Sequence, residues 1–173
     1  KRPPHVAMLL ENHLELVALF GGCGIAGATL FGINTGLRGE VLAGVVNHSR
    51  ARLLVVDDKL LPEVERVRAE LRTVASENIV TLSELRRCLD TEVGPAEAAR
   101  PYPDVVVKPE TNLMVIYTSG TTGLPKGIIN NHFKLCATGV GVSMNTGMHR
   151  DDIGYACMPL FHSNSLFVGL MPC

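Results

Sequence analysis

Apolar and polar positions alternate in blocks along the first half of the chain, and the spacing within each block indicates an element. Short apolar runs bounded by polar residues predict strands, and apolar residues three and four apart predict helices. In chain order we expect a strand at His5–Leu10, a helix at Leu14–Ile25, a strand at Ala28–Ile33, a helix at Arg38–Ser49 and a strand at Ala51–Val56.

The second half continues this alternation. Apolar residues at helical spacing, with charges between them, predict one amphipathic surface helix over Leu60–Val74. The further expected elements are a strand at Asn78–Thr81, a helix at Ser83–Leu89, a strand at Leu113–Tyr117, a helix at Asn131–Met144, a strand at Ile153–Met158 and a helix from Ser163 onward. Strands that alternate with helices predict an α/β fold with a mixed, mostly parallel sheet flanked by helices.

Composition adds one unusual feature, a high apolar content. The chain has 173 residues and a formal net charge of −1, which excludes a broad electrostatic surface for nucleic acid. Its mean hydropathy is +0.21. Together with a first residue Lys1 and an apolar run up to Cys173, this predicts a fragment whose apolar surface further sequence would cover. Five widely spaced cysteines without a metal-binding pattern indicate free thiols and a cytoplasmic setting.

Three runs without charge are candidates for membrane spans: Leu16–Leu37, Leu135–Met148 and Ile153–Cys173. The first and last reach the roughly 20 residues that a span requires. Glycines interrupt the first run, and Pro159 and His162 interrupt the last. We therefore expect buried elements of an α/β core, while peripheral membrane contact stays open.

A glycine-rich segment over residues 22–27 fits the dinucleotide-binding pattern G-x-G-x-x-G. That pattern needs a strand before it and a helix after it, with an acidic residue about 20 positions on. The residues that follow are strand-like and contain Gly32 and Gly36 instead. We therefore favour a helix of small residues that turns into the next strand, and keep an NAD-type oxidoreductase as the alternative.

A second glycine-rich segment follows the apolar strand Leu113–Tyr117, the position where α/β sheets present ligands. Its glycines let backbone amides approach a phosphate, its hydroxyls can donate hydrogen bonds, and its lysine adds a positive charge. It departs from the Walker A pattern, because a proline and a glycine replace residues that the pattern requires. The candidate phosphate-binding residues are Thr118, Ser119, Gly120, Thr121, Thr122, Gly123 and Lys126.

The string YTSGTTGLPKG at residues 117–127 resembles the phosphate-loop signature of adenylate-forming (AMP-binding) enzymes, which include acyl-CoA synthetases. A second block typical of that family, MPLFHSN, follows at residues 158–164, and residues 5–58 resemble its opening α/β region. Within the family, residues 33–55 and 157–173 look most like the branch of fatty-acid transport proteins and very-long-chain acyl-CoA synthetases.

The resemblance implies a two-step reaction. ATP, with Mg²⁺, activates a long- or very-long-chain fatty acid to acyl-adenylate, and coenzyme A then displaces AMP. Thr118 through Gly123 would surround the β- and γ-phosphates, Lys126 would lie near the leaving pyrophosphate, and Thr118 could touch Mg²⁺. His162 matches the family histidine near the acyl carboxylate. Leu166 stands where some relatives carry an aromatic gate.

The resemblance also implies a domain plan. Residues 1–173 would form an incomplete part of a large N-terminal AMP-binding domain, with the C-terminal domain absent. We expect a first α/β portion at residues 1–94, a proline-rich joint at 95–110, and the phosphate loop and acyl-site segment at 111–173. A fragment of this kind would be inactive alone, and a non-enzymatic nucleotide-binding module remains the other alternative.

Overall fold

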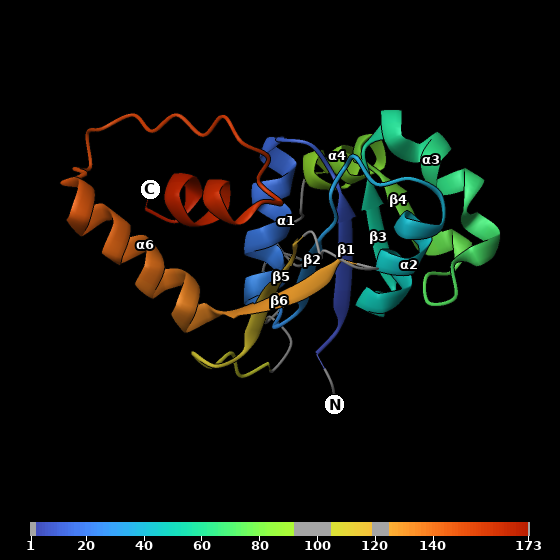
Figure 1. The fold of residues 1–173 in the computed structure, drawn as a ribbon, viewed down its shortest axis with the longest axis horizontal. Coiled ribbons are helices and arrows are strands. Elements are labelled where there is room, and N and C mark those ends of the chain that lie inside the picture. The colour runs from blue at the N-terminus through green and yellow to red at the C-terminus, as the bar shows by residue number, and fades with distance from the viewer. Residues whose placement is uncertain (1–2, 92–104, 119–124, 173) are drawn as a thin grey trace.

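The computed structural model of the chain describes residues 3–91, 105–118 and 125–172 and contains one mixed sheet. Its strands are β1 (His5–Leu9), β2 (Thr29–Gly32), β3 (Leu53–Val56), β4 (Ile79–Thr81), β5 (Asn112–Thr118) and β6 (Lys126–Asn131). They lie in the order β4-β3-β1-β2-β5-β6 (Figure 1). The first five in this order are parallel, and β6 runs antiparallel to β5. The expected mostly parallel α/β sheet is confirmed.

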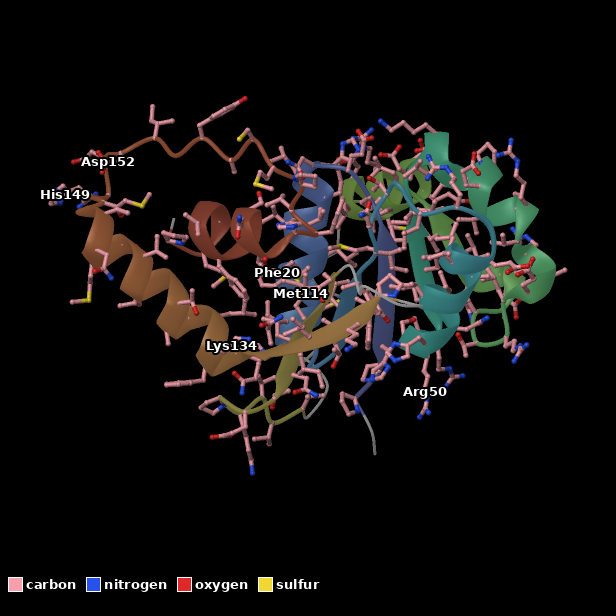
Figure 2. All side chains as sticks on the ribbon, in the orientation of Figure 1. Phe20, Arg50, Met114, Lys134, His149 and Asp152 are labelled. Carbon is pink, nitrogen blue, oxygen red and sulfur yellow. The ribbon has the colours of Figure 1, made fainter. Side chains whose placement is uncertain are left out.

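Helices connect these strands. They are α1 (Leu14–Ile25), α2 (Gly39–Ser49), α3 (Leu61–Arg66), α4 (Leu82–Asp90) and α6 (His132–Thr146), with a short π-helix at Ser165–Leu170 that we call the C-terminal helix. In Figure 1, α6 runs away from the sheet, and the following segment returns across the top of the view to the C-terminal helix beside α1. His149 and Asp152 mark the outer end of this return (Figure 2).

Alternate side chains of the strands enter two separate cores, one on each face of the sheet. Ala7 and Leu9 pack with residues of α2 and α3. Met8 and Leu10 pack on the opposite face, with residues of α1, α4, α6 and the C-terminal helix. A sheet covered on both faces explains why its strands read as continuous apolar runs rather than as alternating ones.

The predicted helix over Leu60–Val74 is wrong in its length. It ends as α3 at Arg66, and a 3-10 turn at Arg68–Glu70 follows. The segment after this turn is held by α2 instead, where the Asn47 side chain donates to the Glu70 carbonyl (2.8 Å) and accepts from the Arg72 amide (2.7 Å). These two backbone groups would otherwise continue the helix. The apolar residues of the predicted helix still enter the core, since the valines at positions 64, 67 and 74 are all buried.

The predicted strand at Ile153–Met158 is also wrong. Residues 152–157 have no regular structure, and Ile153 is 98% exposed. The apolar character alone predicted this strand, but no neighbouring strand pairs with it among the residues that the structure describes. Conversely, β6 was not predicted, because glycine and asparagine residues that disfavour strands surround its two isoleucines. Pairing with the buried β5 holds it in place.

The three charge-free runs considered as membrane spans form ordinary elements of this fold. The first contains α1 and β2, the second lies mostly in α6, and the third contains the irregular return and the C-terminal helix. Within residues 3–91, 105–118 and 125–172, no helix combines the length and the apolar character needed to cross a bilayer.

Candidate functional site

The two described ends of the candidate phosphate loop lie together at the carboxyl edge of the sheet. Thr118 is the last residue of β5, Lys126 is the first of β6, and the two are paired in register. The Thr118 hydroxyl donates to the Lys126 carbonyl at 3.4 Å, and both residues are exposed. The loop therefore opens from the turn end of a hairpin. The other candidate residues, Ser119, Gly120, Thr121, Thr122 and Gly123, lie outside the described residues.

Tyr117 anchors the strand directly before this loop. Its hydroxyl lies 3.1 Å from His48 Nδ1 and donates to the Val45 carbonyl at 3.4 Å, both in α2. Burial raises the pKa of the Tyr117 hydroxyl to about 12, so this group stays protonated and keeps its hydrogen-bonding role. The end of β5 is thereby fixed to a helix on one face of the sheet.

His162, the candidate acyl-site histidine, lies in a turn just before the C-terminal helix. Its amide donates to the Pro159 carbonyl (2.9 Å), and its carbonyl accepts from the Leu166 amide (3.1 Å). Its ring Nδ1 accepts from the Asn164 amide at 3.4 Å. In the neutral ring the proton is therefore on Nε2. The residue is exposed, so Nε2 can face a ligand.

The turn that carries His162 reaches the same edge of the sheet as the phosphate loop. Phe161 is only 8% exposed, and its Cβ lies 3.2 Å from where a Cβ on Gly32 would be. Gly32 ends β2 and pairs with Ile116, two residues before Thr118 on the neighbouring strand. The structure thus brings the two predicted parts of the site to the ends of adjacent strands. A cavity of about 260 Å³ lies beside this turn.

The alternative dinucleotide site at residues 22–27 is wrong in its geometry. Gly22 and Gly24 lie in the C-terminal half of α1, with no strand directly before them. Gly27 has φ +64° and ends the helix, where the Ala28 amide donates to the Cys23 carbonyl (2.8 Å). This is a Schellman C-terminus. The segment presents carbonyl groups rather than the amide groups that a pyrophosphate needs.

The carboxyl edge also holds polar residues that sequence reasoning missed. His13 Nε2 lies 2.8 Å from Oδ2 of Asp57, which is buried at the end of β3. Asn12 follows β1 and contacts the turn before His162. The available signal was the position of both Asn12 and Asp57 directly beyond buried strands, where parallel sheets gather functional side chains.

Candidate cation ligands are few in the described residues, where no group of three His, Cys, Asp or Glu side chains could hold a metal ion. Thr118 fits the predicted Mg²⁺ contact in one respect. The residue is exposed, and among the described residues its hydroxyl makes one long hydrogen bond, as donor, which leaves its lone pairs able to face a hard cation.

Comparison with known proteins places this geometry in a family. The family model described as "AMP-binding enzyme" matches residues 1–173. The medium/long-chain-fatty-acid–CoA ligase FadD17 of Mycobacterium marinum is 33% identical over 168 residues, which cover 97% of this chain and 31% of that protein. A 2-succinylbenzoate–CoA ligase of Bacillus mycoides is 31% identical, over 96% of this chain and 30% of its own length.

A solved structure agrees with these sequence relatives. The long-chain-fatty-acid–CoA ligase FadD1 of Archaeoglobus fulgidus superimposes with a TM-score of 0.80 at 27% identity, over 99% of this chain and 34% of that one. This chain therefore spans about a third of the length of the relatives it matches. The relatives that this chain matches are acid–thiol ligases. Because the family model matches the chain along its whole length, the chain belongs to the AMP-binding enzyme family.

Proposed function

We propose that this chain supplies the phosphate loop and the acyl-site histidine of a fatty-acid–CoA ligase. The enzyme would form acyl-adenylate and pyrophosphate from ATP and a long- or very-long-chain fatty acid, and then transfer the acyl group to coenzyme A with release of AMP. The observation that carries this proposal is the family match over residues 1–173, which includes both ends of the loop at the carboxyl edge.

In the first step a carboxylate oxygen attacks the α-phosphorus, and the bond to the leaving pyrophosphate breaks. Negative charge then grows on the pyrophosphate, so the protein's main contribution is positive charge and hydrogen-bond donors placed there. We assign the donors to Thr118, Ser119, Gly120, Thr121, Thr122 and Gly123, and the charge to Lys126. Bound Mg²⁺ would neutralise part of the phosphate charge, and we assign Thr118 as a residue that would contact it.

His162 would act at the acyl side of the same reaction. Its Nε2–H can donate a hydrogen bond to a carboxylate or acyl-adenylate oxygen, because Nδ1 already accepts from the Asn164 amide. Its turn lies at the end of β2, beside the strand that leads into the phosphate loop. This arrangement would hold the carboxylate close to the α-phosphate, which reduces the entropic part of the barrier.

The domain plan and the substrate belong to the same proposal. The chain would form the first part of the large N-terminal domain, with portions at residues 1–94 and 111–173 joined through 95–110. The fatty-acid preference is supported by the relatives FadD17 and FadD1, which are named as fatty-acid–CoA ligases. The branch of fatty-acid transport proteins and very-long-chain synthetases is proposed on the blocks at residues 33–55 and 157–173.

The test uses the longest reading frame that contains this chain. Fatty acids of increasing length are assayed by ATP–pyrophosphate exchange, which reports the first step alone, and then by acyl-CoA formation. Changing Thr121 and Thr122 together to valine should lower exchange at least about tenfold, as expected when donors to a developing charge are removed.

A matched control is Thr138→Val in α6, which removes a hydroxyl that, among the described residues, donates to the Lys134 carbonyl of its own helix (2.7 Å). This variant should exchange at the normal rate. Equal rates for the loop variant and the control would refute the phosphate-loop assignment. Exchange with aryl acids but with no fatty acid would refute the substrate class and leave the family intact.

A further inference from the structure

Asn12 joins the loop after β1 to the turn that carries His162. Its Nδ2 donates to the Met158 carbonyl at 2.9 Å, and its Oδ1 accepts from the Leu160 amide at 2.7 Å. We propose that Asn12 is a positioning residue for His162, holding the turn through these two bonds, which we call the Asn12 bridge. This inference rests on the proposed role of His162 in adenylate formation.

The Asn12 bridge holds the backbone on both sides of Pro159, the residue whose carbonyl accepts from the His162 amide. The His162 amide donates to the Pro159 carbonyl, and Pro159 lies between the two bridged residues. A third bond reinforces the arrangement, since the Ser165 hydroxyl also donates to the Met158 carbonyl (2.7 Å). The side-chain amide of Asn12, almost 150 positions earlier in the chain, therefore helps to fix Pro159, and through Pro159 it helps to fix His162.

The chain that leads into the turn cannot set this position by itself. Residues 152–157 are exposed and have no regular structure. Asn12, in contrast, follows a central strand: β1 lies between β3 and β2 and hydrogen-bonds to both. Phe161 in the turn also packs against Gly32, but an apolar contact permits sliding that two directed hydrogen bonds resist. The bridge thus ties the turn to the loop that directly follows a central strand of the sheet.

The chain offers a matched comparison for the bridge. Asn47 makes the same pair of bonds, donating to the Glu70 carbonyl (2.8 Å) and accepting from the Arg72 amide (2.7 Å). That bridge joins α2 to the segment after α3 on the other face of the sheet. Asn12→Ala and Asn47→Ala therefore remove equivalent bonds, and only the first removes bonds next to His162.

The experiment measures ATP–pyrophosphate exchange in the longest reading frame that contains this chain, with palmitate as the acid. Asn12→Ala should lower kcat about 10- to 100-fold, the loss expected for a misplacement of roughly 1 Å, with the KM for ATP within about threefold. Asn47→Ala should stay within about twofold of the unchanged enzyme. In a His162→Ala background, Asn12→Ala should cost less than about twofold further, because its effect passes through His162.

A second measurement is independent of activity. Amide hydrogen exchange of the peptide that covers residues 158–162 should quicken at least about tenfold in Asn12→Ala, since the Leu160 amide loses its acceptor. Unchanged hydrogen exchange, or an equal loss of kcat with and without His162, would overturn the inference. Normal kcat in His162→Ala would overturn both this inference and the proposed role of His162, with the family activity intact. Failure to exchange ATP and pyrophosphate with any acid would instead overturn the proposed function, and with it the catalytic role of the bridge.

Discussion

Replacing Gly139 by alanine should weaken the contact between α6 and the end of the C-terminal helix. A Cβ at this position would lie 2.5 Å from the Met171 carbonyl oxygen and 2.8 Å from its carbon. Both are backbone atoms, so the segment must move as a whole, which costs about 1–3 kcal/mol as an overpacked contact. Alanine is better than glycine inside a helix by about 1 kcal/mol. The net result is a protein that is less stable by about 0–2 kcal/mol.

Gly141 is the control, because it lies in the same helix and a Cβ there would meet no atom within 4 Å. Gly141→Ala should therefore stabilise the protein by about 1 kcal/mol. The helix gain cancels between the two variants, and their free energies of unfolding should differ by about 1–3 kcal/mol. Urea unfolding with linear extrapolation measures this difference. Equal stabilities for the two variants would refute the packing of Met171 against Gly139.

Three further results are expected. Burial raises the pKa of the Cys23 thiol to about 11, so near neutral pH it should react with Ellman's reagent far more slowly than the exposed thiols of Cys88, Cys136 and Cys157, as peptide mapping would show. The hydrogen bond from Arg86 lowers the pKa of Glu15, so its stabilisation is present above the unfolded pKa and is lost as the pH falls through the lower folded value. Arg86→Leu should raise that pKa toward 4.5 in an NMR titration, and an unchanged value would contradict the pairing. Thr81→Ala removes the capping box with Glu84 and should cost about 1 kcal/mol in urea unfolding, whereas Thr81→Ser should retain most of it.

The buried strands and their connecting helices could be predicted from the sequence because burial leaves a local pattern. β1, α1 and α2 each lie within one residue of the predicted bounds. Prediction failed where groups outside the segment itself decide the outcome. Asn47 takes the backbone groups that would continue the helix beyond α3, and β6 exists because β5 offers it an edge. Neither partner is visible from spacing along the chain.

The candidate site likewise has one part that the sequence predicts and one part that it does not. The phosphate loop could be proposed from the sequence because its glycines, hydroxyls and lysine are contiguous and follow a buried strand. The role proposed for Asn12 could not, since a lone asparagine after a strand is an ordinary loop residue. The role proposed for Asn12 depends on its hydrogen bonds to Met158 and Leu160, two residues that are distant in the sequence and that the fold brings close to it.

The parallel direction of β1, β2 and β4 has an electrostatic consequence. Each is followed by a helix, so α1, α2 and α4 all begin at the carboxyl edge of the sheet. Helix N-termini carry partial positive charge, and their carbonyl ends carry the opposite sign. A formal net charge of −1 counts only whole charges and hides this asymmetry. Glu15, Glu40 and Glu84 lie in the first turns of these three helices and place carboxylates beside that partial positive charge. The helix ends at this edge are therefore largely compensated within the chain, so the exposed Lys126 matters more to the charge that a ligand meets there.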